Sequence, residues 1–154
     1  MSQETILGRI QADMAAAMKA RDADTLSTLR MLKSALMEAK TRKPKEDSLG
    51  PEEEIEVLQR YVKKRREAIE ELRMVSREDL VAREEREIEV TRRYLPQAMG
   101  EEEIRAVVRE AIAQTGAASP KDQGKVMGAV MARVKGRAEG GVVSRLVKEA
   151  LGPG

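Results

Sequence analysis

The chain of 154 residues contains no cysteine and no histidine, and it also lacks asparagine, phenylalanine and tryptophan. These absences exclude disulfides, the usual zinc sites, a thiol nucleophile and a Ser-His-Asp triad. Two tyrosines are the only aromatic residues, which argues against RNA-binding modules that stack bases on aromatic side chains. No apolar run resembles a membrane span or a secretory leader. We therefore expect a cytoplasmic protein that makes no membrane contact.

Helical periodicity runs along nearly the whole chain. Apolar residues make up 41% of the sequence and charged residues 36%. The apolar residues recur three or four positions apart, without the alternation that is typical of strands. We predict an all-α fold whose core consists of aliphatic side chains and methionine.

The first part of the sequence predicts long helices arranged as hairpins. Asp24 is the expected N-cap of the second helix, and Ser76 with Asp79 forms a capping pair before the fourth. A polar loop covers residues 41–50, and Pro96 ends the fourth helix. The four predicted helices cover residues 2–20, 24–39, 51–75 and 76–95.

After residue 97 the pattern changes to shorter helices, predicted at residues 101–114, 120–134 and 140–151. Ser119 supplies an N-cap, Pro120 the first helical position and Asp122 an acid three residues after the cap, which together mark a helix start. We predict two domains: residues 1–97 form the long-helix domain of about four helices, and residues 98–154 form a small three-helix domain.

The sequence gives no sign of an autonomous active site. Most carboxylates have lysine or arginine at pairing distance, whereas a catalytic acid is expected in isolation with a perturbed pKa. The acidic runs 52–54 and 101–103 are interpreted as complements to helix dipoles. There is no phosphate-binding glycine loop of the Walker type and no dinucleotide fingerprint. We predict no catalytic residue, no metal site and no cofactor.

Basic charge is concentrated near the C-terminus. Up to Met99 the basic and acidic side chains are equal in number, whereas from Ala111 onward seven bases face three acids. A basic patch is expected of a protein that binds phosphate-bearing partners, although a solvated mixed surface is the alternative. The basic run 63–66 carries less weight, because Glu67 and Glu70 supply partners four residues away.

Two glycine-containing features stand out in this basic region. Gly124, Gly128 and Ala132 form a strip of small residues, which we expect to pack against a neighbouring helix of the same domain; close approach of a ligand is the alternative. Gly136 is expected to end its helix in the left-handed conformation.

The linker that follows this helix could cradle an anion. Gly140 and Gly141 would open the last helix with bare amides beside Lys135 and Arg137, unless Glu139 caps those amides itself. The residues predicted to contact RNA share the last two helices and their linker: Lys121, Lys125, Arg133, Lys135, Gly136, Arg137, Gly140, Gly141, Arg145 and Lys148.

These motifs resemble the GatB/YqeY family. The resemblance rests on Gly-Lys-Val-Met-Gly-Ala-Val-Met at 124–131 and Lys-Gly-Arg-Ala-Glu-Gly at 135–140. Further matches are Ile-Gln-Ala-Asp-Met at 10–14, Leu-Ser-Thr-Leu-Arg-Met-Leu-Lys at 26–33 and Tyr-Leu-Pro at 94–96. The similarity covers essentially the full chain and implies an all-helical protein with a distinct C-terminal domain.

The resemblance also implies a link to tRNA. The C-terminal domain is similar to the tail of the B subunit of the tRNA-dependent amidotransferase, a tail that helps hold tRNA. This family is associated with carbon–nitrogen ligase activity that uses glutamine as amido-nitrogen donor, but the catalytic domains have no counterpart in this chain. One departure is Glu139-Gly140, where the amidotransferase tail typically has Asn-Pro.

We therefore predict a non-catalytic, tRNA-associated helical protein. Two alternatives remain open: a helical adaptor for a protein partner, or an accessory module that acts only with a catalytic amidotransferase subunit. An amidotransferase or tRNA-synthetase-type protein is the expected partner besides tRNA.

Overall fold

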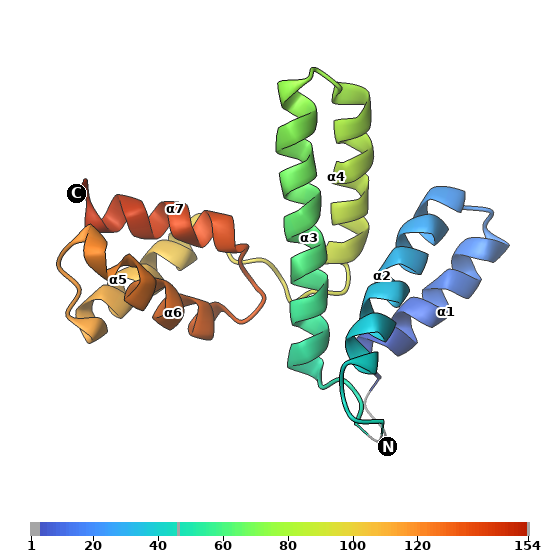
Figure 1. Cartoon of the computed structure of the whole chain (residues 1–154), viewed down its shortest axis with the longest axis horizontal. Helices are drawn as coiled ribbons and strands as arrows, with labels where there is room; N and C mark the ends of the chain where they lie inside the picture. The colour runs from blue at the N-terminus through green and yellow to red at the C-terminus, as the bar shows by residue number, and fades with distance from the viewer. Residues whose placement is uncertain (1–3, 46, 154) are drawn as a thin grey trace. The chain divides into compact units, whose positions relative to one another are not determined.

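The computed structural model describes residues 4–45 and 47–153, and all regular structure in these residues is helical (Figure 1). Seven α-helices and one 3-10 turn occur in this part of the chain, without any strand. The prediction of an all-α fold is thus confirmed. The chain divides into two compact units, Met1–Leu95 and Pro96–Gly154, which we call the N-terminal unit and the C-terminal unit.

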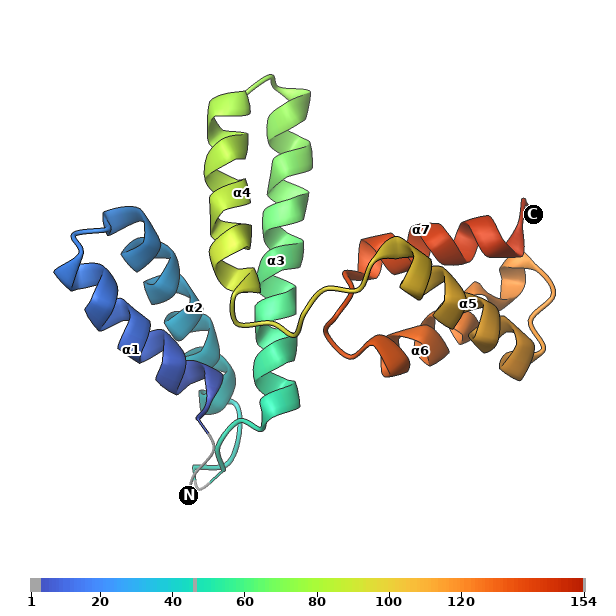
Figure 2. The ribbon, with the colours of Figure 1, turned by 180° about the vertical axis from the view of Figure 1, so that it is seen from behind.

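The N-terminal unit consists of two helical hairpins (Figures 1 and 2). Helix α1 packs on α2 and α3 packs on α4, while α2 contacts both helices of the second hairpin. Leu29, Leu32 and Leu36 of α2 are buried in the centre of the larger core. A smaller core fills the space between α3 and α4 around Val62 and Ile88. The bounds are α1 (Ile6–Lys19), α2 (Ala23–Thr41), α3 (Pro51–Met74) and α4 (Glu78–Arg92).

The first two helix starts differ from the predicted ones. The predicted start of the first helix at residue 2 lies outside the described residues, and Thr5 caps α1 by accepting the Gly8 N–H at 2.9 Å. Asp22, not Asp24, caps α2, because its side chain accepts the Thr25 N–H at 3.2 Å. The predicted cap Asp24 lies inside the first turn instead.

The predicted capping pair before α4 is also wrong. Ser76 has a positive φ of 58° and closes the turn after α3. Asp79 pairs with Arg77 at 3.3 Å and does not return to Ser76. Helix α4 ends at Arg92, three residues before the predicted end at Leu95, and the chain reaches Pro96 through a short turn.

A buried carboxylate joins the two hairpins. Glu54 of α3 is only 4% exposed, and its oxygens accept the backbone N–H groups of Ile6 at 3.2 Å and Leu7 at 2.9 Å. These amides belong to the first turn of α1, which has no intrahelical acceptor for them. Glu54 lies in the first turn of α3, as predicted for a complement to the dipole of that helix, and it also accepts hydrogen bonds from the N-terminus of another helix.

Both tyrosines are buried in the N-terminal unit with an acidic acceptor. The Tyr61 hydroxyl donates to Glu87 at 3.0 Å, and the Tyr94 hydroxyl donates to Asp13. Burial raises the pKa of both phenols, and the neighbouring carboxylates add to that effect. Each ring also lies under a guanidinium, with Arg65 5.0 Å from the centre of the Tyr61 ring.

The C-terminal unit is a three-helix domain with an aliphatic core. It contains α5 (Glu101–Thr115), the 3-10 turn η1 (Pro120–Asp122), α6 (Gln123–Val134) and α7 (Gly140–Leu151). The predicted start at Ser119 is present, but it opens with η1 before α6 begins. The buried core residues are all aliphatic: Ile104, Val108, Ala111, Val126, Val130, Val134, Ala138, Val143, Leu146 and Val147.

Candidate nucleic-acid interface

All ten residues predicted to contact RNA lie in the C-terminal unit, on three neighbouring segments. Lys121 lies in η1 and Lys125 in the first turns of α6, with Arg133 near the other end of that helix. The linker between α6 and α7 holds Lys135, Gly136 and Arg137. The remaining four residues lie on α7: Gly140, Gly141, Arg145 and Lys148.

The strip of small residues on α6 faces solvent. Gly124, Gly128 and Ala132 are all exposed, and a Cβ atom added at either glycine would meet nothing within 4 Å. The expectation that a neighbouring helix packs on this strip is therefore wrong for the described residues. Lys125 lies on the same exposed side of α6 as the strip.

Hydrogen bonds to Asp122 hold the segment that leads into α6. The Asp122 carboxylate accepts the Ala118 N–H at 2.9 Å and the Ser119 N–H at 3.3 Å. These two hydrogen bonds lower the pKa of Asp122, with a smaller contribution from the charge of Lys125. Lys121 and Lys125 are both exposed on either side of this acid.

The linker after α6 is anchored to the beginning of α5. Lys135 and Gly136 both have positive φ angles, 36° and 85°, so the left-handed conformation begins one residue before the predicted Gly136. The Arg137 carbonyl accepts the Met99 N–H at 2.8 Å, and the Arg137 Nε donates to the Gln97 carbonyl at 3.0 Å. The backbone of the linker is thus held on two sides.

The predicted arginines are paired with carboxylates. Arg133 pairs with Glu110, and Arg137 with Glu103 at 3.5 Å. Arg145 pairs with Glu101 and, at 3.2 Å, with Glu149 on its own helix. These ion pairs raise the pKa of Arg145 further. The acidic first turn of α5, predicted as a dipole complement, therefore also neutralises the arginines around the linker.

Helix α7 begins where the sequence predicts. Gly140 is its first residue, and both Gly140 and Gly141 are exposed. Glu139 occupies the N-cap position without a side-chain capping hydrogen bond, so the alternative in which its carboxylate satisfies the helix amides does not occur. Its backbone carbonyl instead accepts the N–H groups of Val142 and Val143, both at 3.1 Å.

In the described part of this unit, the charged side chains that make no ion pair or hydrogen bond are all basic. Each of its seven acidic side chains takes part in an ion pair, a hydrogen bond or an electrostatic interaction. Four of its nine basic side chains make no ion pair or hydrogen bond within the described part of the chain: Arg109, Lys121, Lys125 and Lys148. Arg109 was not among the predicted residues, because it lies in a stretch of the sequence where acids outnumber bases.

Within residues 4–45 and 47–153, no three or more acidic side chains are arranged to hold a metal ion. None of the described helices is long and apolar enough to cross a membrane.

Comparison with known proteins places the chain in a family. The family model described as "Yqey-like protein" matches residues 7–151. "Altered inheritance of mitochondria protein 41, mitochondrial" of Pyrenophora tritici-repentis is 32% identical over 154 residues, which cover 97% of this chain and 83% of that protein. "Uncharacterized protein C22F3.15" of Schizosaccharomyces pombe is 38% identical over 81 residues, which cover 52% of this chain and 63% of that protein. The chain therefore belongs to the YqeY-like protein family.

Proposed function

We propose that this protein is a non-catalytic tRNA-associated protein whose C-terminal unit contacts the RNA backbone. The observation that carries the proposal is the sign of the charges that make no ion pair or hydrogen bond: the acids of this unit are all engaged, and the four basic side chains without such a contact in the described residues are exposed. Lysine and arginine bind nucleic acid mainly by replacing counter-ions at phosphates, which needs no base readout and no aromatic platform.

Within the predicted set, the lysines are the strongest candidates. Lys121, Lys125 and Lys148 can each approach a phosphate without first breaking an ion pair. Arg133, Arg137 and Arg145 would exchange carboxylate partners that are about half exposed, and such exposed pairs are worth roughly 0–1 kcal/mol. We therefore place the first contacts on the lysines and secondary contacts on the arginines and the α7 glycines.

The resemblance of this unit to the tail of the amidotransferase B subunit supports tRNA as the RNA. Chemistry on the tRNA would then reside in a separate catalytic protein, and this chain would act as an accessory. Release of ammonia from glutamine by the pure protein, abolished by a point mutation in it, would contradict the non-catalytic proposal. The relative from Pyrenophora tritici-repentis carries "mitochondrial" in its name, so a cytoplasmic location stays a prediction.

A protein-binding function is the second candidate, because the N-terminal unit exposes several large apolar side chains. Met74 is 85% exposed and Val75 65% exposed at the turn between α3 and α4. Met18, Met31 and Met37 are also exposed. Flexible methionines suit surfaces that accept protein partners. Association that depends on these methionines, in a protein that binds no tRNA, would favour the adaptor.

The test is tRNA affinity measured by fluorescence anisotropy at moderate salt. In the triple variant K121Q/K125Q/K148Q we expect at least tenfold weaker binding than in the unaltered chain. The pair K63Q/K64Q is the matched control, because both lysines are exposed and without an ion pair in the described residues, contrary to the predicted pairing with Glu67. Equal affinity of all three proteins would overturn the site, and no tRNA binding by any of them would overturn the function.

The reversal of Lys135 and Arg137 to Glu is a weaker test of the same proposal. Arg137 holds the linker through Gln97 and Glu103, so a carboxylate there would also disturb the backbone. A loss of binding in that variant would combine the loss of a phosphate contact with a change of fold. The lysine variants avoid this ambiguity.

A further inference from the structure

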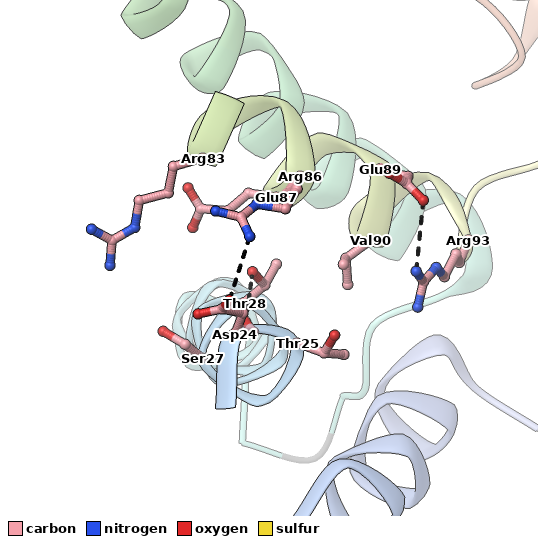
Figure 3. A pocket seen from close by; sticks show the side chains of 10 residues that line it. All are labelled: Asp24, Thr25, Ser27, Thr28, Arg83, Arg86, Glu87, Glu89, Val90 and Arg93. Atoms are coloured by element: carbon pink, nitrogen blue, oxygen red, sulfur yellow. Dashed lines mark hydrogen bonds and ion pairs between the residues drawn. The ribbon is translucent and has the colours of Figure 1, made fainter. Parts of the chain in front are cut away.

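A cleft of about 240 Å³ lies between the beginning of α2 and the middle of α4 in the N-terminal unit (Figure 3). Asp24, Thr25, Ser27 and Thr28 line it from α2. Arg83, Arg86, Glu87, Glu89, Val90 and Arg93 line it from α4. It is a polar cleft, lined by three guanidinium groups, three carboxylates, three side-chain hydroxyls and one apolar residue, Val90.

Arg83 and Arg86 share one face of α4, and Arg93 is the C-cap residue of this helix. Arg83 and Arg86 are three residues apart, which is one turn and a rise of about 4.5 Å. Arg93 follows seven residues after Arg86. Two guanidinium groups one turn apart can reach a single tetrahedral oxyanion together, and the planar fork of arginine suits phosphate in particular.

The existing partners of these arginines are weak. Arg86 lies 3.5 Å from Asp24, with the side chains 63% and 82% exposed. Arg93 lies 3.8 Å from Glu89 on its own helix, with exposures of 57% and 73%. Figure 3 shows both contacts as dashed lines and none from Arg83, which makes no ion pair in the described residues. Exposed pairs of this kind exchange at little cost.

The third carboxylate of the cleft is engaged elsewhere. Glu87 accepts the Tyr61 hydroxyl at 3.0 Å and lies 3.8 Å from Arg65, both of them on α3. Arg65 lies outside the cleft lining and is shared with Glu84, 3.5 Å away. The lining therefore carries three guanidinium groups and three carboxylates. A phosphate would be held locally by Arg83, which makes no ion pair in the described residues, and by Arg86, whose partner Asp24 is exposed.

We propose that the α2–α4 cleft binds a phosphate group, held by Arg83 and Arg86 with the Thr25 and Ser27 hydroxyls of α2 as additional donors. The phosphate comes either from a free ion or small metabolite, or from a polynucleotide backbone. The proposal is independent of the tRNA contact in the C-terminal unit, because every residue that carries it belongs to α2 and α4.

The test is a titration of the full-length protein with inorganic phosphate, followed by the backbone amide resonances of Thr25, Ser27 and Val90. We expect the chemical shifts of these amides to saturate with phosphate concentration, both in the unaltered protein and in K121Q/K125Q. In R83Q/R86Q the dissociation constant should rise at least fivefold. R60Q is the matched control, since Arg60 is an exposed α3 arginine with a 3.8 Å pair to Glu56, and its titration should follow that of the unaltered protein.

A second arm uses a short single-stranded RNA in place of inorganic phosphate. Saturation by both probes would indicate a single phosphate as the recognised group, and saturation by the RNA alone would indicate a backbone ligand. Shifts that do not saturate with either probe, or that are the same in R83Q/R86Q, would overturn the cleft site. Circular dichroism of each variant confirms that the helices are intact.

Discussion

The two units of this chain use polar groups in different ways. In the N-terminal unit, Glu54 is buried at the start of α1, and Tyr61 and Tyr94 are buried with acidic acceptors. In the C-terminal unit, every buried residue is aliphatic and the ion pairs are at the surface. Buried polar contacts specify how the hairpins of the first unit pack, whereas the second unit has an aliphatic core and places its polar contacts at the surface.

The sign of the uncompensated charges differs in the same way. The N-terminal unit leaves charges of both signs without partners, for example Lys63 and Lys64 beside Glu67 and Glu71 on α3. The C-terminal unit leaves basic side chains only. A surface with residual charge of one sign attracts a polyanion, and one with interspersed charges does not. This contrast is the reason to place RNA binding in the C-terminal unit.

The largest expected effect comes from the aliphatic core of the C-terminal unit. Leu146 is 1% exposed, and Leu146→Ala should cost about 2–5 kcal/mol through lost burial and a cavity. Small domains have little stability in reserve, so we expect the C-terminal unit to unfold while the N-terminal unit stays folded. Amide hydrogen exchange resolves the two units, and simultaneous loss of protection in both would contradict this separation.

A smaller effect is expected from the buried carboxylate of the N-terminal unit. Glu54→Ala leaves two amides of α1 without acceptors, and hydrogen bonds to charged groups are worth about 1.5–3 kcal/mol. Urea unfolding should show this loss in the N-terminal unit. Glu56→Ala is the control, because Glu56 is exposed on the same helix with a 3.8 Å ion pair, and it should change stability by less than about 0.5 kcal/mol.

The exposed glycines of α6 predict a gain in stability. Each glycine inside a helix costs roughly 1 kcal/mol relative to alanine, and neither Gly124 nor Gly128 would meet another atom if a Cβ were added. The double change to alanine should therefore raise the melting temperature of the C-terminal unit. A lower melting temperature would mean that a neighbouring element packs on this strip, as the sequence analysis expected.

The smallest effect concerns the pH dependence of stability that arises from Glu84 of α4 and its ion-pair partner Arg65 of α3. Burial raises the pKa of Glu84, while Arg65 acts against the rise; two of their polar atoms, Arg65 Nε and Glu84 Oε2, are buried without a hydrogen bond. Ionised Glu84 therefore opposes folding at neutral pH, and this destabilisation disappears as the pH falls through the raised pKa. Glu84→Gln should be the more stable protein at pH 7, with a difference that shrinks towards pH 4. Lower stability of Glu84→Gln at pH 7 would show that attraction to Arg65 dominates.

Local patterns in the sequence predicted the helices and much of the core. The spacing of Val126, Val130 and Val134 identifies the buried face of α6 directly, and the glycine start of α7 follows from its composition. Helix starts were less predictable where two acids compete, as Asp22 and Asp24 do, because side-chain geometry decides which of them caps.

Contacts between distant residues could not be predicted in this way. Arg145 and Glu101 are 44 positions apart, and Glu54 lies 48 residues from Ile6. No periodicity in a single sequence links such pairs, since they meet only after the helices pack. For this reason the free positive charge predicted at the linker is too large, and Arg109, which makes no ion pair or hydrogen bond in the described residues, could not be predicted.

The salt dependence of tRNA binding tests the central claim most directly. The slope of log Kd against log salt concentration reports the number of phosphates that the protein neutralises. The full-length K121Q/K125Q variant should have a slope flatter by about two units than the unaltered chain, because two phosphate contacts are lost. The slope of K63Q/K64Q should stay unchanged. Equal slopes for all three proteins, or a flatter slope in K63Q/K64Q alone, would contradict an RNA site in the C-terminal unit.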